Sequence, residues 1–471
     1  MRPIQFAVTL ILCSSASVAV AQPALRTEAS QAMRKATEYY TTKVAAHGGY
    51  VYHYSLDLKR RWGEGVANAD QAWVQPPGTP TVGMAYLAAY KATGDKIYLD
   101  AAHEAAKALM YGQLKSGGWT NSVDFDPNGK LRAQYRNGPA KGRNTSTLDD
   151  GITQSALQFM MQADQAFKFQ DTEIHEATLF ALDALFKAQF ANGGFPQVWT
   201  GPVPEQPVLK ASYPTYEWRT ENRIKAYWDL YTLNDNSPGF VADTLLEVME
   251  IYKDPRARKA LEKLGDFLIL AQMPEPQPAW AQQYDFQMRP VWARKFEPPA
   301  ISGRESIDAI ETLLTVYRVT QDKKYLEPIP RAIAWLKKSV LKDGRLARYY
   351  ELKTNTPLYM NEKYELTYDD SNAPDHYGWK TNHNLPQVEK EFAEVKASKP
   401  AQSILGKSTV SAKQVKAVVD ALDKDGRWVS HYNGERLVGQ PKIRPNEDYL
   451  SSEVFSENLE LLSAYVQSQG N

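Results

Sequence analysis

Three copies of one short pattern, two glycines followed by an aromatic residue, divide the N-terminal half of this 471-residue chain. They are Gly48-Gly49-Tyr50, Gly117-Gly118-Trp119 and Gly193-Gly194-Phe195. They lie roughly 70 to 80 residues apart, which accommodates a pair of helices and their loops. We interpret Asp343-Gly344-Arg345 and Asp425-Gly426-Arg427 as degenerate later copies. Recurrence of this kind is typical of a fold built from repeated units.

Between these turns, apolar residues recur at helical spacing. Segment 81–92 places Val82, Tyr86, Ala89 and Tyr90 on one face, and segment 155–169 shows the same pattern. Gly94 is suited to end the first helix because it accepts the left-handed conformation. No long stretch alternates apolar and polar residues as a strand would. We therefore predict an all-α fold, an α/α toroid, in which helical hairpins form an incomplete barrel with the glycine-aromatic turns at one rim.

Three long, proline-rich stretches interrupt the helical pattern at residues 201–214, 273–299 and 352–386. Long loops are uncommon unless they are functional, so we expect them at the active-site face of the toroid. These stretches are rich in Trp, Tyr and charged residues rather than in Gly and Ser, so their composition is not typical of linkers between domains. We therefore predict one domain over residues 22–471.

The N-terminus has the parts of a secretory signal peptide. Met1-Arg2-Pro3 precedes an apolar run, Ile4–Val20, which ends in Ala19-Val20-Ala21. We predict cleavage after Ala21 and a secreted or periplasmic protein; the alternative is a buried N-terminal helix. The run is short for a bilayer, and no membrane span is predicted. The only cysteine is Cys13, so the mature chain has no disulfide and no cysteine-based zinc site.

Composition narrows the choice of ligand. The formal net charge is zero, so no global field favours nucleic acid, and a polyanion would need local Arg and Lys clusters. The chain holds 11 Trp and 27 Tyr, whose flat faces suit stacking on sugar rings, although core packing explains many of them. Carbohydrate is therefore the expected class of ligand.

Two acidic motifs lie just before predicted helices: Thr147-Leu148-Asp149-Asp150 and Thr232-Leu233-Asn234-Asp235. A single aspartate there is explained by helix capping. Two adjacent carboxylates repel each other unless a cation compensates them, and carboxylate and amide oxygens suit calcium. Both interpretations stay open for the first motif, and the recurrence of the motif favours the metal interpretation. The absence of Cys and of paired His disfavours zinc.

Two further segments combine charge with aromatic residues. Segment 283–306 is an anion-site candidate because guanidinium groups bind carboxylates bidentately; the alternative is structural pairing of Arg294 or Arg304 with Glu297 or Glu305. Segment 364–380 mixes acids, bases and aromatics. The predicted substrate-binding residues are Arg289, Trp292, Arg304, Tyr368, Tyr377 and Trp119, and the predicted catalytic residues are Arg294, His376 and Lys380.

Six motifs, in order over about residues 45 to 380, resemble the pectic acid lyases of polysaccharide lyase family 10. They are Trp73–Ala85, Ser116–Trp119 with Asp124–Pro127, Thr147–Asp150, Asn192–Gln197, Leu233–Asn236, and Ala293–Glu297 with Ser302-Gly303. Six motifs in the same order as in the family indicate membership more strongly than any one motif alone. The resemblance implies an α/α toroid, secretion and calcium-assisted β-elimination of polygalacturonate.

The resemblance also implies roles for individual residues. It makes Asp149 with Asp150, and Asp235, the calcium ligands, although the family usually has Asp-Asn at the first site. Arg294 would be the cation at the substrate carboxylate. The expected partner is an acidic polysaccharide or oligouronide, bound by a monomer with calcium as cofactor.

One segment departs from the family pattern. Family members place arginines shortly before a Gly-Tyr-x-Trp segment, and one of them serves as the base. The matching residues here, 372–380, include no arginine. The base is then Arg294, His376, Tyr368 or Lys380, or the protein acts on another uronate. Two other functions stay open: a glycoside hydrolase on the same toroid, and a non-catalytic protein that binds acidic polysaccharide.

Overall fold

The computed structural model describes residues 15–138, 142–397 and 410–469. Helices dominate this part of the chain, and they begin and end close to where the apolar periodicity does. Gly94, with a φ of 71°, ends the second helix as predicted. The α-helices are α1 (Ser15–Tyr39), α2 (Thr79–Thr93), α3 (Lys96–Gly112), α4 (Ile152–Ala166), α5 (Thr172–Lys187), α6 (Ser237–Ile251), α7 (Pro255–Ala271), α8 (Gly303–Thr320), α9 (Ile329–Ser339), α10 (Leu385–Ala397), α11 (Ala412–Asp420) and α12 (Ser452–Ser468).

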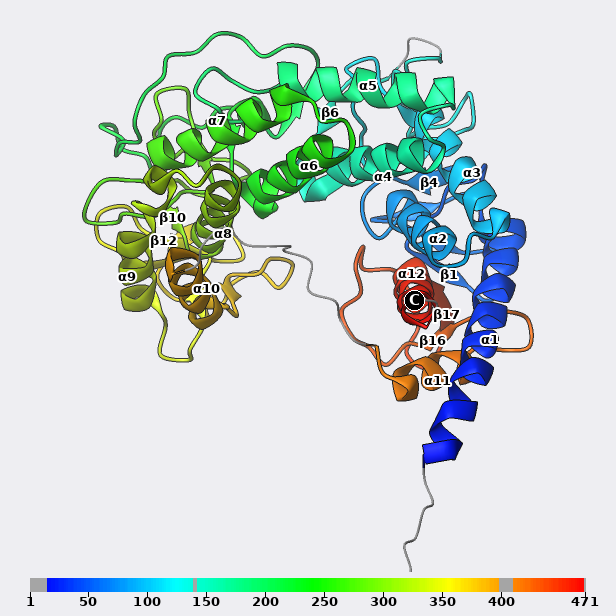
Figure 1. Ribbon diagram of the computed structural model, residues 1–471. Helices are drawn as coiled ribbons and strands as arrows, with labels where there is room; N and C mark the ends of the chain where they lie inside the picture. Colours follow the sequence, from blue (N-terminus) through cyan, green and yellow to red (C-terminus); the bar gives the residue numbers. More distant parts are fainter. Residues whose placement is uncertain (1–14, 139–141, 398–409, 470–471) are drawn as a thin grey trace, which may run out of the picture.

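The helices form two layers of an open arc (Figure 1). Helices α12, α2, α4, α6 and α8 contact one another in this order and make the inner layer, and α10 packs against α8. Helices α1, α3, α5, α7 and α9 cover the outer side, and α11 packs on α1 and α12 at one end of the arc. The arc stays open between α10 and α12. The predicted α/α toroid, an incomplete barrel, is therefore confirmed.

The predicted glycine turns have one shared conformation. The first glycine of each copy has a positive φ, between 79° and 101°, in Gly48, Gly117, Gly193, Gly344 and Gly426. At Gly193 a side chain is also excluded by space, because a Cβ would lie 1.8 Å from the carbonyl oxygen of Lys263 in the next outer helix. Each turn carries the chain from an outer helix to the segment that leads into an inner helix, so the turns lie at one rim.

A further turn of the same kind has no glycine, and its sequence does not reveal it. Gln272, directly after α7, donates from Nε2 to the carbonyl oxygen of Pro278, as Gln113 does to Gly117. Trp280 follows and donates from Nε1 to Leu268, as Trp119 does to Leu109. Pro278 and Ala279 take the places of the two glycines here. The turn is thus recognised by its hydrogen bonds rather than by its residues.

Short strands join neighbouring turns around this rim. Among the described residues, the rim pairs are β4 (Gln71–Trp73) with β5 (Ser122–Asp124), β6 (Ser146–Thr147) with β7 (Val198–Trp199), β8 (Tyr231–Thr232) with β9 (Gln283–Tyr284), and β10 (Ile301–Ser302) with β12 (Tyr349–Tyr350). Strand β12 continues to β13 (Pro357–Met360) and β14 (Leu366–Thr367), and β11 (Leu346–Ala347) pairs with β15 (Lys380–Thr381). Such strands are too short to show an alternating pattern. Those in 352–386 replace part of a predicted loop.

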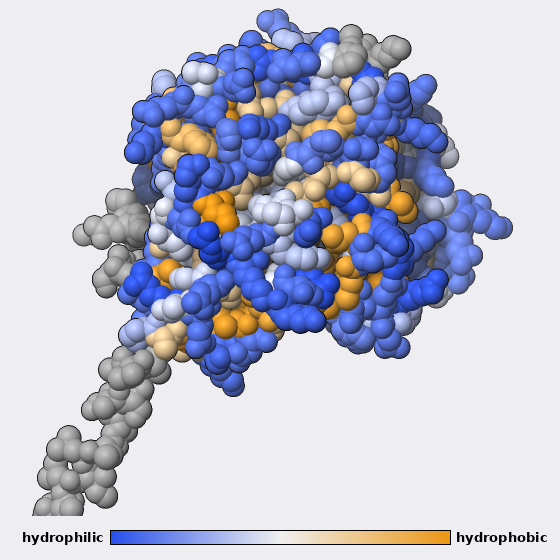
Figure 2. Space-filling model, turned by 90° about the vertical axis from the view of Figure 1, so that its right-hand side faces the viewer, coloured by the Kyte–Doolittle hydropathy of each residue, from blue (hydrophilic) through white to orange (hydrophobic). Residues whose placement is uncertain are grey.

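The two ends of the described chain meet at one end of the arc. A five-stranded sheet joins β16 (Val429–His431), β17 (Asp448–Ser451), β1 (His53–Ser55), β2 (Arg61–Trp62) and β3 (Val66–Ala67). Helix α1 packs on α11 and α12 beside it. The outer face at this end is mostly hydrophilic, with small, separate apolar patches (Figure 2). One hydrophobic cluster extends from Ala29 in α1 to Val466 in α12.

The predicted signal segment lies largely outside the described residues, as does Cys13. Only its last residues, 15–21, are described, and they form the beginning of α1. Within the described part of the chain, we find no helix with the length and apolar character needed to cross a membrane. Cleavage after Ala21 and one domain over 22–471 stay predictions.

Candidate active site

The two acidic loops at the rim have the same backbone conformation. Asp149-Asp150-Gly151 forms the 3-10 turn η2 before α4, and Asn234-Asp235-Asn236 forms η4 before α6. Asp150 and Asp235 both adopt left-handed conformations, with φ of 46° and 49°. Aspartate occupies this region more readily than most residues because its short polar side chain can hydrogen-bond locally. The repeated motif in the sequence is a repeated turn in space.

The rim strands bring these two loops together. The amide of Leu148 donates to the carbonyl oxygen of Gln197 at 2.8 Å and so extends the β6–β7 pair up to the first acidic motif. One carboxylate oxygen from each of Asp149, Asp150 and Asp235 lies within 4.8 Å of the other two. Neighbouring hairpins therefore assemble one acidic triad from the residues in which the sequence predicted a metal site.

Helix capping does not account for these aspartates. The residues that cap α4 and α6 are Gly151 and Asn236, and neither helix has a side-chain cap hydrogen bond. The 3-10 turn η2 has none either. The capping alternative for the first motif is therefore wrong.

The negative charge of the triad is only partly compensated by nearby arginines. Burial and repulsion from Asp235 raise the pKa of Asp149 to about 6. Partial burial, with repulsion from Asp149 and Asp235, raises the pKa of Asp150 to about 7, and Glu64 adds to this effect. Converging hard oxygen ligands that disfavour one another's charge fit a divalent cation such as calcium. The residues present thus suit the ion that the resemblance implies.

Arg294 lies beside the triad and has a structural partner. Its Nε donates to Oε2 of Glu297 at 2.8 Å and its Nη2 to Oε1 at 2.6 Å. The predicted alternative, a pair between these two residues, is confirmed. Glu297 is buried, whereas 44% of the arginine side chain stays exposed. The guanidinium also opposes the rise in the pKa of Asp149 and of Asp150. One cationic edge therefore remains available next to the triad.

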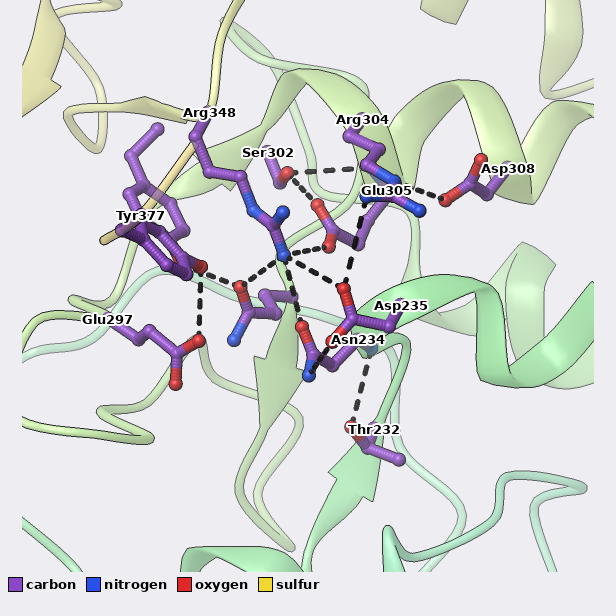
Figure 3. A network of polar contacts seen from close by, with 12 residues as sticks. Thr232, Asn234, Asp235, Glu297, Ser302, Arg304, Glu305, Asp308, Arg348 and Tyr377 are labelled. Atoms are coloured by element: carbon purple, nitrogen blue, oxygen red, sulfur yellow. Dashed lines mark hydrogen bonds and ion pairs between the residues drawn. The ribbon is translucent and has the colours of Figure 1, made fainter. Parts of the chain in front are cut away.

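A second arginine, Arg348, is central to the site and was missed from the sequence (Figure 3). Its Nη2 donates to Oε1 of Glu305 at 2.9 Å and to Oδ1 of Asn234 at 3.1 Å, and lies 3.5 Å from Oδ1 of Asp235. Arg348 and Glu305 are both buried. This buried ion pair supports the loop that presents Asp235.

The turn pattern contains a signal for Arg348. Leu346 follows the degenerate turn at 343–345 and takes the place of the aromatic residue, so Arg348 comes two residues after it. Gln197 and Gln282 have the same place after Phe195 and Trp280. The carbonyl oxygen of Arg348 accepts from the amide of Gly303 at 3.2 Å, as that of Gln197 does from Leu148. Alignment of the turns would have placed Arg348 at the rim.

Two predicted substrate-binding residues contact this network. Arg304 is exposed, with Nη1 4.0 Å from Oδ1 of Asp235. The hydroxyl of Tyr377 donates to Oε1 of Glu297 at 3.0 Å and shares a 2.6 Å hydrogen bond with Tyr349. Their proximity to Asp235 and Arg294 is compatible with a role in binding, which stays a prediction.

Three other predicted substrate-binding residues are buried or paired with another residue of the protein. Trp119 and Trp292 are fully buried, and the Nε1 of Trp292 donates to the carbonyl oxygen of Trp218 at 2.7 Å. Their predicted role as stacking faces is wrong, because neither ring has an open face. Arg289 forms an ion pair with Asp285 at 2.9 Å. Because of this close ion pair, Arg289 is less available to bind a substrate than Arg304 is.

The remaining predictions fall on the segment after β14. Tyr368 is 58% exposed. His376 is also exposed, and its ring packs edge-on against Phe296, 5.2 Å between centroids. Lys380 forms ion pairs with Asp370 and, at 3.8 Å, with Asp343. The catalytic roles of His376 and Lys380 stay predictions, and Lys380 already has acidic partners.

A cleft of about 590 Å³ opens beside Asp149 and Asp150. Gln75, just before α2, donates from Nε2 to Oε1 of Glu64 and to Oδ2 of Asp150, each at 3.0 Å. Sequence reasoning missed the other main polar and aromatic residues of this cleft: Glu64, Gln75, Thr120, Asn121, Arg143, Thr145, Gln197, Tyr227 and Trp228. Gln75 and Gln197 lie within quoted motifs but had no predicted role, and the others come from segments without a motif, so only the fold brings these residues together.

Solved structures with similar folds include carbohydrate-active proteins. A mutant family 10 polysaccharide lyase from Cellvibrio cellulosa, in complex with trigalacturonic acid, is 18% identical, covers 62% of this chain and 92% of its own, and gives a TM-score of 0.47. A cellobiose 2-epimerase from Spirochaeta thermophila is 15% identical, covers 96% of this chain and 99% of its own, and also gives 0.47. No curated protein matches the sequence.

The family match is to the sequence itself. Residues 113–347, about half of the chain, match the family model of the pectic acid lyases. This stretch includes both acidic loops and Arg294. It confirms the resemblance that the motifs indicated, and the chain belongs to the pectic acid lyase family, a family of polysaccharide lyases.

Proposed function

We propose that this protein is a pectate-lyase-type enzyme that cleaves a uronate-containing polysaccharide by calcium-assisted β-elimination. The observation that carries the proposal is the triad of Asp149, Asp150 and Asp235, three converging carboxylates at the rim of a cleft. Family membership supports the reaction class. The proposal includes export through the signal segment and action as a monomer.

The reaction requires removal of the weakly acidic C5 proton of a uronate. A base takes that proton, its bonding electrons form the C4=C5 double bond, and the C4–O glycosidic bond breaks as the leaving oxygen gains a proton. Calcium held by the three aspartates would supply positive charge to the uronate carboxylate and so acidify that proton.

The side chains divide the remaining work. Arg294 would place its exposed edge against the substrate carboxylate, because Glu297 fixes the other edge. Arg348 would act as a positioning residue, since it holds the loop of Asp235 through Asn234. The hydrogen bonds with Glu297 keep Arg294 protonated, which suits it to serve as this cation rather than as the base. Because Lys380 has acidic partners, His376 is the strongest of the remaining catalytic candidates for the base.

The direct test is digestion of polygalacturonate with and without a calcium chelator. We expect ultraviolet absorbance from the unsaturated product, and its loss when calcium is removed. New reducing ends without that absorbance would instead indicate a glycoside hydrolase. Affinity without any product would indicate a binding protein. Either result would overturn the proposed lyase function.

Calcium should stabilise the protein more at pH 8 than at pH 5. The pKa values of about 6 for Asp149 and about 7 for Asp150 lie above the ordinary 3.8, so protons compete with the cation as the pH falls through 7 and 6. In metal-free protein the same raised pKa values mean that ionisation destabilises the fold as the pH rises through this range. Melting temperature with and without calcium, measured from pH 5 to 8, checks both signs. An equal calcium-induced shift of the melting temperature at pH 5 and at pH 8 would contradict calcium binding by these aspartates.

A further inference from the structure

The arginines around the acidic triad have acidic partners. Arg294 is bound by Glu297, and Arg348 by Glu305. Arg304 lies 3.8 Å from Asp308 as well as near Asp235. Each of these guanidinium groups is therefore neutralised, in whole or in part, by the protein itself.

Arg143 lines the cleft and is different. It is exposed, and among the residues that the structure describes its side chain forms no hydrogen bond or ion pair. Glu64, an acidic residue of the same cleft, is hydrogen-bonded by Gln75 instead. Asp149 and Asp150 line the cleft too. An unpaired cation therefore faces a cleft whose own carboxylates do not bind it.

The backbone around Arg143 is fixed although its side chain is free. Its carbonyl oxygen accepts from the amide of Gln134 at 2.8 Å. The next residue, Asn144, accepts from the amide of Ser116 through Oδ1 at 2.7 Å. Gly142 has a φ of 96°, and a Cβ there would lie 2.3 Å from the carbonyl oxygen of Arg132. Binding by Arg143 therefore requires ordering of the side chain only, which lowers its entropic cost.

We infer that Arg143 is a specificity residue that binds the carboxylate of a uronate unit flanking the one at the acidic triad. The inference rests on the proposed function, because a polyuronate carries a carboxylate on every unit. A guanidinium group forms two parallel hydrogen bonds to a carboxylate and cannot do so with its methyl ester. Arg143 would thus favour free over esterified uronates, while Arg294 serves the unit that reacts.

The test compares the binding of two ligands of equal length, a saturated oligogalacturonate and its methyl ester. Binding to the full chain with calcium is followed by fluorescence quenching, immediately after mixing and before products accumulate. For Arg143→Gln we expect affinity for the free acid to fall at least tenfold, on the order expected for a lost charged hydrogen bond, with no change for the ester. Arg143→Lys should retain part of the preference.

Lys115→Gln is the matched control. It removes one positive charge from an exposed residue of a neighbouring segment that does not line the cleft, so it reports the effect of net charge alone. An equal loss for both ligands in Arg143→Gln, or an equal loss in Lys115→Gln, overturns the inference. So does a wild-type protein that binds neither ligand.

The outcomes for the inference and for the proposed function can be separated. If the wild type releases unsaturated product but Arg143→Gln keeps its preference for the free acid, the inference alone fails. If the preference depends on Arg143 but no unsaturated product forms, the lyase proposal fails and Arg143 remains a carboxylate-binding residue.

Discussion

Asp235→Ala should abolish calcium-dependent lyase activity and leave the protein folded. The substitution removes one of three converging carboxylates, and loss of a group that stabilises developing charge costs on the order of a thousandfold in kcat. The fold should survive because Arg348 keeps its buried ion pair with Glu305. Initial rates on polygalacturonate and the calcium-induced shift in melting temperature measure the two effects.

Asp150 offers a graded version of the same experiment. Asp150→Asn keeps an oxygen ligand and a residue that tolerates the left-handed conformation, so we expect weakened calcium binding with some activity. Asp150→Ala keeps neither and should be inactive. Asp100→Ala, on an exposed carboxylate of the outer helix α3, should retain full activity. Wild-type rates in both alanine variants of the triad would show that these residues do not hold the metal.

Arg348→Met should cause the largest loss of stability at the site. It leaves the fully buried carboxylate of Glu305 without a cation, and removal of one partner from a buried pair costs about 3–5 kcal/mol. Asn234 loses its hydrogen-bond donor as well. Urea denaturation gives the free energy of unfolding. Arg345→Met, three residues earlier in an exposed pair with Asp343, should leave that free energy unchanged.

A double variant separates stability from positioning. In Arg348→Met/Glu305→Gln the unpaired charge is gone, so most of the lost free energy of unfolding should return. Activity should remain low, because nothing then holds the loop of Asp235 through Asn234. Full activity in the double variant would falsify the positioning role of Arg348, and wild-type stability in Arg348→Met would exclude the buried pair as a source of stability.

The sequence predicts those features that depend on local conformation. A positive φ at Gly117 or Gly193 restricts the residue type, so the turns recur in recognisable form. The two acidic loops are similar for the same reason. Once the repeat is known, the rim position of Asp149 and Asp235 follows from helix order. Their convergence then needs only the pairing of β6 with β7 and the bridge between Pro196 and Tyr231.

Features that depend on long-range packing were not predictable. Trp119 has an aromatic ring suited to sugars, and only the packing shows that the ring is buried. The turn pattern indicates a rim position for Arg348, but only the packing shows that it pairs with Glu305 and Asn234. Gln75 donates to Asp150, although the two residues are 75 positions apart in the chain and precede different inner helices. The turn before Trp280 has Pro278 and Ala279 in place of the glycines, so its hydrogen bonds alone identify it.

The sheet that joins the two ends of the described chain has a consequence for the order of folding. Tyr40 donates to the carbonyl oxygen of Ser451, 411 residues later, and Ser452 donates to that of Val51 across 401 residues. During synthesis, the face of α2 that packs on α12 therefore stays uncovered until α12 has been made. The middle hairpins can fold as they emerge, whereas the hairpin of α2 and α3 stays partly uncovered until α12 has been made. Chaperone binding should accordingly concentrate on α2 and α3 rather than on the middle hairpins.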